Sequence, residues 1–71
     1  MPFINVRLTP PGLTKEEKEQ VISGIAKVMV DVLDKPPEMT HIVIEEVPSD
    51  NWGVAGETVT VRRARKQKEQ T

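Results

Sequence analysis

Apolar and polar positions alternate at the start of the chain, along residues 2–8 (PFINVRL). Ile4, Val6 and Leu8 fall on one face, and the intervening positions, from Phe3 onward, fall on the other. This period of two is typical of a β-strand. The TPPGL segment that follows predicts a loop, because its prolines cannot donate backbone hydrogen bonds.

The next segment has the signals of a helix that begins after Thr14 and ends before Pro36. Thr14 is a favourable N-cap, and Glu17 three residues later completes a capping box. Pro36 and Pro37 end the pattern. Apolar residues recur between these points at steps of three and four, which predicts one apolar stripe: Val21, Ile22, Ile25, Val28, Met29, Val32 and Leu33.

The THIVIEEV segment, residues 40–47, is a second alternating stretch. Ile42 and Ile44 share one face, while His41 and Val43 share the other. A strand, a helix and a strand of these lengths predict a right-handed β-α-β unit with parallel strands. One helix covers only one face of a two-stranded sheet, so we expect a second subunit to bury the other face.

The rest of the chain predicts turns and one short element. TVTVRR, residues 58–63, is expected to be a short strand after the glycine-containing VPSDNWGVAGE segment. From about residue 64 a charged tail is expected to fray. We therefore predict a single domain over residues 1–71 of the α/β class: one β-α-β unit with parallel strands and a short C-terminal strand or hairpin, assembled into an oligomer.

Composition limits how such a small domain can be stabilised. The chain has 71 residues, no cysteine and one histidine, which excludes disulfides and thiolate metal sites. A domain of this size buries only about 60% of its unfolded surface, so self-association is the expected remedy. Neither a membrane span nor a signal peptide is recognisable, and a cytoplasmic location is expected.

The last residues carry a basic cluster, although the formal net charge of the chain is −1. Such a cluster raises the hypothesis of nucleic-acid binding, which predicts a salt-sensitive affinity that is lost when residues after Val61 are removed. No aromatic side chain interleaves with the basic residues, so a solvated terminus and no nucleic-acid partner are the preferred interpretation. The cluster consists of Arg62, Arg63, Arg65, Lys66 and Lys68.

Three residues are candidates for chemistry or binding. If Met1 is removed, Pro2 becomes a secondary amine, and an α-amino group has an unperturbed pKa of about 7.7–8.0, close enough to neutrality for a general base. The alternative is that a proline follows methionine without chemical reason. His41 could hydrogen-bond a substrate carboxylate or simply pack on its strand. Trp52 could wall a pocket or anchor a subunit contact.

Taken together, these features resemble the 4-oxalocrotonate tautomerase family. The resemblance rests on MP leading into a strand, on the LTKEEKEQVISGI helix and on VIEEVPSDNWGVAGE, and it extends from Pro2 to about Arg63. It implies a β-α-β fold that forms a dimer and then usually a hexamer, with no metal or organic cofactor. It also implies that Pro2, freed of Met1, is the general base and then the general acid. Trp52 would be an aromatic pocket residue that reaches a neighbouring subunit's site.

The chain departs from the family pattern at two carboxylate-binding arginines. Leu13 or Gly12 stands where the prototype has an arginine before the helix, with one extra residue in the loop, and His41 stands where the second arginine lies. Neither leucine nor a neutral histidine offers the two-pronged fork of a guanidinium. Compensation could come from the cations Arg7, Lys35 or Arg63.

The resemblance therefore implies 1,3-keto–enol tautomerisation of a 2-hydroxy-dienoate or an arylpyruvate-type 2-oxo acid, with His41 and Trp52 as substrate-binding residues. A homohexamer (a trimer of dimers) or a homodimer is expected, with no membrane partner. One alternative is a non-catalytic oligomeric module that has kept the scaffold. Another is a hydratase or dehalogenase relative, in which Glu45 or Glu46 activates water, although a solvated or interface role suits these glutamates better.

Overall fold

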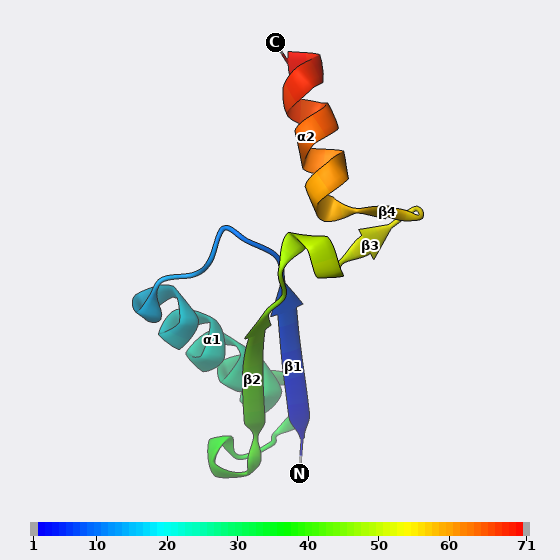
Figure 1. The fold of residues 1–71 in the computed structure, drawn as a ribbon. Helices are drawn as coiled ribbons and strands as arrows, with labels where there is room; N and C mark the ends of the chain where they lie inside the picture. Colours follow the sequence, from blue (N-terminus) through cyan, green and yellow to red (C-terminus); the bar gives the residue numbers. More distant parts are fainter. Residues whose placement is uncertain (1, 71) are drawn as a thin grey trace.

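Two parallel strands and one long helix form the main body of the protomer (Figure 1). The computed structural model describes the backbone of residues 2–70 and the side chains as far as residue 67. β1 (Phe3–Leu8) pairs in parallel with β2 (His41–Glu46), from Phe3 opposite His41 to Leu8 opposite Glu46. α1 (Lys15–Leu33) and the short 3₁₀ helix η1 (Pro37–Met39) connect the two strands. The predicted β-α-β unit with parallel strands is confirmed.

Both ends of α1 are fixed by local hydrogen bonds. The Thr14 hydroxyl accepts from the Glu17 N–H at 3.0 Å, and the Glu17 carboxylate accepts from the Thr14 N–H at 2.8 Å, so the predicted capping box is present. At the other end Asp34 adopts a left-handed conformation with φ 55°, and its N–H donates to the Val30 carbonyl at 3.0 Å. The helix thus ends at a left-handed cap, before the prolines are reached.

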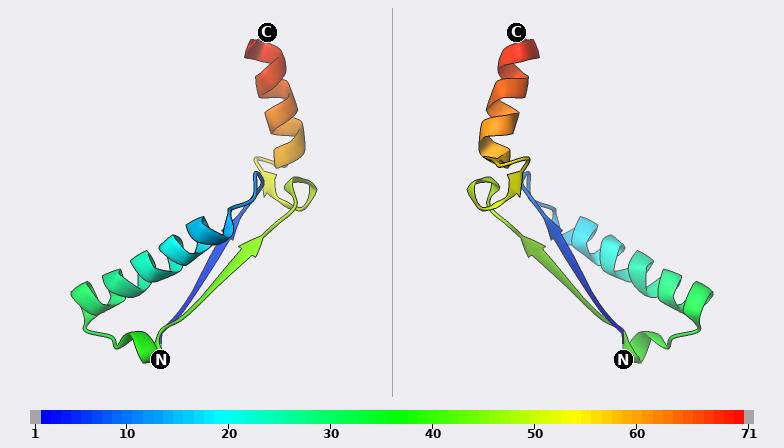
Figure 2. Two further views of the ribbon diagram at one scale, coloured as in Figure 1. Left: turned by 90° about the vertical axis from the view of Figure 1, so that its left-hand side faces the viewer. Right: turned by 90° about the vertical axis from the view of Figure 1, so that its right-hand side faces the viewer.

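α1 covers one face of the two-stranded sheet, and the side views leave the other face bare (Figure 2). Val21, Ile25 and Met29 are half-buried against the sheet, whereas Val28 and Val32 remain 56% and 73% exposed. The apolar stripe predicted for this helix is therefore wider than two strands can cover. Part of it faces outward in the protomer.

The bare face of the sheet, called here the open face, is also apolar in part. Phe3 is 66% exposed and Val43 is 40% exposed, and none of the side chains that the structure describes is fully buried. The radius of gyration is 16.1 Å, whereas a compact chain of this length would have about 11 Å. A single protomer is thus an extended object of 47 × 25 × 18 Å without a closed core.

Beyond β2 the chain forms a 3₁₀ turn, a hairpin and a second helix, which project from the far end of the sheet (Figure 1). η2 (Ser49–Asn51) leads to β3 (Gly53–Val54) and β4 (Glu57–Thr58), which pair antiparallel. The turn residues Ala55 and Gly56 both have positive φ, 55° and 79°, as a two-residue turn of type I′ requires. The expected C-terminal hairpin is confirmed.

The strand predicted over residues 58–63 is wrong beyond Thr58, because α2 (Val59–Gln70) begins there. The Val59 N–H donates to the Trp52 carbonyl at 2.8 Å and closes the hairpin. The Thr58 hydroxyl then accepts from the Val61 N–H at 3.2 Å, as an N-cap does. Residues 64–70 continue this helix. Within residues 2–70, neither helix has both the length and the apolar character that crossing a bilayer requires.

Candidate active site

The parallel register brings Pro2 and His41 together at one end of the sheet. The Pro2 carbonyl accepts a hydrogen bond from the His41 N–H at 3.0 Å, and the next pair in the ladder is Phe3 with His41. Pro2 is half-buried and His41 is exposed. Pro2 therefore lies at the end of a strand beside the only histidine of the chain, while Met1 lies outside the described residues.

The segment from η2 to β3 lies at the other end of the same sheet, beyond the carboxyl ends of both strands (Figure 1). Trp52 belongs to this segment. The ladder extends there to the Val47 N–H, which donates to the Leu8 carbonyl at 2.8 Å. Trp52 is half-buried and lines a groove of about 420 Å³, together with Arg7, Val47, Asn51 and Gly53. The structure thus separates Trp52 from Pro2 within one protomer. A site that uses both residues needs two copies of the chain.

Arg7 belongs to a polar row along the open face of the sheet. Its Nε donates to the Asn5 side-chain oxygen at 2.7 Å, and the Asn5 amide donates to the Glu45 carboxylate at 2.8 Å. The Arg7 Nε also lies 3.9 Å from the same carboxylate oxygen. Alternation along β1 had placed Arg7 on this face, but the sequence alone did not show that β1 delivers it to the groove beside Trp52.

Leu13, which with Gly12 was compared above with a family arginine, has a structural role in the protomer. Its N–H donates to Glu46 at 3.4 Å, and Lys18 pairs with the same oxygen of Glu46 at 3.0 Å. The hydrogen bonds from Lys18 and Leu13 hold the pKa of Glu46 below its usual value. A Cβ at Gly12 would meet the Glu46 carboxylate at 3.0 Å, so glycine permits this close approach. The carboxylate fixes the start of α1 against the end of β2.

The glutamates considered for water activation both lie at the carboxyl end of β2, opposite Arg7 and Leu8 in the register. Glu45 is hydrogen-bonded by Asn5, and Glu46 by Leu13 and Lys18. Within the protomer neither carboxylate is near Pro2. Among the described residues, no three histidine, cysteine or acidic side chains come together in a way that could hold a metal ion.

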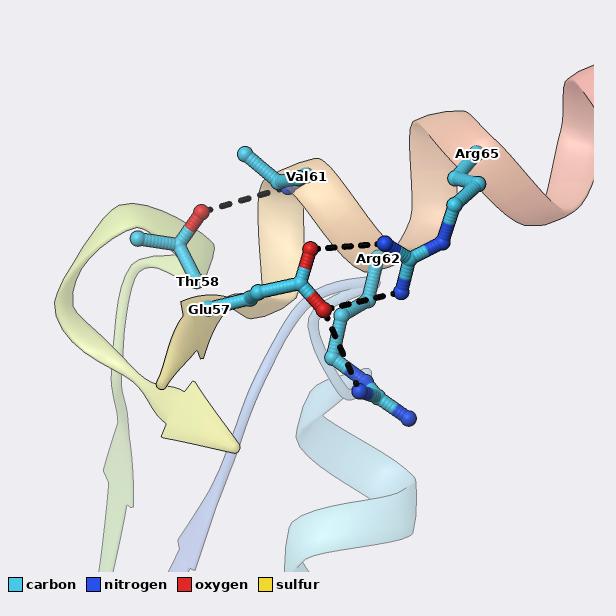
Figure 3. Close-up of polar contacts among 5 residues, drawn as sticks. All are labelled: Glu57, Thr58, Val61, Arg62 and Arg65. Carbon is cyan, nitrogen blue, oxygen red and sulfur yellow. Dashed lines mark hydrogen bonds and ion pairs between the residues drawn. The ribbon is translucent and has the colours of Figure 1, made fainter. Parts of the chain in front are cut away.

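The basic cluster near the C-terminus is partly neutralised by Glu57 (Figure 3). Arg65 grips the Glu57 carboxylate at 2.7 and 2.9 Å, and Arg62 approaches it at 3.6 Å. The hydrogen bonds from Arg65 hold the pKa of Glu57 below its usual value. A hollow of about 440 Å³ lies among Arg62, Arg63, Arg65 and Lys66. The Lys68 side chain is outside the described residues.

Arg63 is used to hold three segments of the chain together. Its guanidinium donates to the Pro10 carbonyl, to the Thr9 hydroxyl at 2.7 Å and to the Ser49 hydroxyl at 3.4 Å. These contacts join α2, the loop after β1 and η2. Lys35, by contrast, follows α1 near the end of the sheet that carries Pro2.

Comparison with known proteins gives one consistent result. The model of the family described as tautomerase enzyme matches residues 2–62. The probable tautomerase K2 of Dickeya dadantii is 51% identical over 63 residues, which cover 89% of this chain and 94% of that protein. The 2-hydroxymuconate tautomerase of Pseudomonas putida is 34% identical over 56 residues, 79% of this chain and 87% of that protein. The solved structure of a 4-oxalocrotonate tautomerase isozyme from Methylibium petroleiphilum has a TM-score of 0.83 at 33% identity, covering 90% of this chain and 98% of that one.

Proposed function

This chain belongs to the tautomerase family and is an isomerase, and from that premise we propose that it catalyses 1,3-keto–enol tautomerisation of a 2-hydroxy-dienoate or an arylpyruvate-type 2-oxo acid. The observation that carries the proposal is the position of Pro2. It heads β1 at an accessible end of the sheet, and the hydrogen bond from the His41 N–H fixes its carbonyl. Removal of Met1 would leave its nitrogen as a secondary amine at that fixed point.

The proposed proton transfer needs a single base that changes role. The neutral Pro2 amine removes the proton from the enol hydroxyl, and the oxygen's electron pair forms the carbonyl as the carbon–carbon double bond breaks. The electron pair released from the double bond takes up a proton at C3, the carbon next to the new carbonyl. The protonated amine supplies this proton, so the amine is regenerated and no net proton is consumed. His41, exposed beside Pro2, is proposed to contact the substrate.

Self-association is part of the proposal, since the protomer alone lacks a closed core. The exposed apolar side chains on the open face and on the outer side of α1 are the surfaces that copies of the chain would bury. We further propose that, in a homohexamer or a homodimer, the amine of one copy lies at the Trp52 groove of another. Native mass spectrometry gives the number of copies directly.

The experiment measures tautomerisation of phenylenolpyruvate and 2-hydroxymuconate by protein whose N-terminus is verified by intact mass. A variant with an uncleaved N-terminal extension keeps the Pro2 ring but acylates its nitrogen, so it should lose at least about a hundredfold in kcat, the usual contribution of a general base. Pro2→Ala keeps an α-amino group after Met1 removal but replaces the secondary amine by a primary one, so it should lose less activity than the blocked variant. Pro37→Ala, a proline away from the terminus, is the matched control and should retain activity.

Two outcomes would redirect the interpretation. Equal activity in the wild type and in the blocked variant would refute the proline mechanism. Inactivity of fully processed protein on both substrates would refute the proposed substrate class, and it is the outcome that the non-catalytic module of the sequence analysis predicts. The contacts of Glu45 and Glu46 give no support to a water-activating role.

A further inference from the structure

The Arg7 guanidinium presents an unused edge at the Trp52 groove. Its Nε is occupied by Asn5, and its nearest carboxylate oxygen, on Glu45, lies 3.9 Å from that same nitrogen. That oxygen already accepts from the Asn5 amide at 2.8 Å. Within the part of the chain that the structure describes, neither Nη of Arg7 has a hydrogen bond or an ion pair. The two amino groups that would form a fork are therefore available to a ligand.

The other cations that could compensate for the missing arginines are placed differently. The Arg63 guanidinium already donates hydrogen bonds to Thr9, Pro10 and Ser49. Lys35 follows α1 at the far end of the sheet from Trp52, and an ammonium group cannot form a two-pronged contact. Of these three cations, only Arg7 lines the groove.

We propose that Arg7 binds the carboxylate of a planar, conjugated monocarboxylate in this groove, with the conjugated part packed along the Trp52 indole. The proposal rests on the proposed function for the chemistry of the substrate and deepens it by naming its class. One arginine fork matches one carboxylate, so a monocarboxylate should bind better than a dicarboxylate. A groove of about 420 Å³ suits a small acid. Because Pro2 of the same protomer lies at the other end of the sheet, the groove would serve the amine of another copy.

The expected size of the effect is taken from the single protomer, in which the Arg7 side chain is 63% exposed. A contact with a carboxylate at such a position is worth less than a buried pair. We expect Arg7→Gln to raise the Kd of such an acid about tenfold, at the low end for a charged hydrogen bond. Arg7→Lys, which keeps the charge but loses the fork, should give an intermediate Kd.

Trp52 supplies the readout, because it is the only tryptophan in the chain. Its fluorescence is titrated with sorbate, a planar dienoate, and with sorbamide, the same skeleton without charge. In the full-length protein, Arg7→Gln should weaken sorbate about tenfold and leave sorbamide unchanged. Glu45→Gln removes the carboxylate that competes for Arg7, and should strengthen sorbate binding by about twofold.

A purely structural role for Arg7 predicts a different pattern. If Arg7 only supported β2 through Glu45, Arg7→Gln and Glu45→Gln would each weaken the binding of sorbate and of sorbamide to the same extent. That result overturns the proposal. An unchanged sorbate Kd in Arg7→Gln also overturns it. Should Arg7→Gln fail to fold, which circular dichroism reports, Arg7→Lys decides: it must weaken sorbate and spare sorbamide.

The binding titration separates this inference from the proposed reaction. Sorbate binding that depends on Arg7, in a protein that does not tautomerise any enol, would refute the reaction and uphold the binding site. Activity that depends on Pro2 but not on Arg7 would uphold the reaction and refute the inference. If both hold, Arg7→Gln raises the KM for phenylenolpyruvate about tenfold and changes kcat by less than about twofold.

Discussion

Replacing His41 by arginine would place a guanidinium at the strand end that carries Pro2. The backbone should tolerate the change, because the hydrogen bond to the Pro2 carbonyl comes from the main-chain N–H of residue 41. The side chain itself is exposed, so no packing is lost. The substitution therefore adds a cationic fork beside the proposed base without altering the sheet.

The magnitude follows from the contact that is added. A hydrogen bond to a charged group contributes about 1.5–3 kcal/mol, and the exposure of this position favours the lower end. About 1.4 kcal/mol is a tenfold change in kcat/KM. We therefore expect His41→Arg to raise kcat/KM for 2-hydroxymuconate, a dicarboxylate, about tenfold relative to phenylenolpyruvate, a monocarboxylate.

The assay is the ratio of kcat/KM for these two substrates, measured side by side so that enzyme concentration cancels. Glu38→Gln is the matched control, because it also raises the net charge by one at an exposed position of η1 but adds no fork. A ratio that changes equally in both variants would show only a general charge effect. A ratio that stays within about twofold of wild type in His41→Arg would refute the reasoning.

Two further predictions concern stability. Thr14→Ala removes the hydroxyl that accepts from the Glu17 N–H. It should lower the free energy of unfolding by about 1 kcal/mol, which corresponds to a fall in Tm of about 4–8 °C. Thr14→Ser should preserve Tm, and an equal loss in both variants would contradict the capping role. The second prediction is a pH dependence. Hydrogen bonds from Arg65 hold the pKa of Glu57 below its usual 4.5, so its stabilisation is present above that value and is lost as the pH falls through the folded pKa. Thermal unfolding from neutral pH to about 3 should show the Tm of wild type falling toward that of Glu57→Gln, and a constant gap would disprove the linkage.

Local signals made most of the fold predictable from the sequence. Thr14 and Glu17 are three residues apart, so their capping box depends on nothing outside the helix end. The alternation in residues 2–8 and 40–47 fixed which side chains share a face, and a strand–helix–strand order of these lengths favours parallel pairing. The strand prediction for the segment after Thr58 was wrong, because four alternating residues are too few to outweigh the helix propensity of the Arg-, Lys- and Gln-rich stretch that follows.

The candidate site was less predictable, because its residues come together through tertiary contacts. Pro2 and His41 were singled out separately, and only the register shows them as neighbours. The sequence alone does not show which of Arg7 and Arg63 is available to a ligand. In the structure Arg63 donates hydrogen bonds to the loop after β1 and to η2, whereas the outer edge of Arg7 faces the groove.

The two ends of the sheet have a consequence for how such a protein can evolve. Under the composite arrangement proposed above, the amine of Pro2 and the groove of Trp52 never need to belong to the same polypeptide. After a gene duplication, one daughter chain could keep the amine and lose the groove, while its sister did the reverse. Neither chain would be active alone, yet their mixed assembly would be, and selection would then preserve the pair as a single obligate unit.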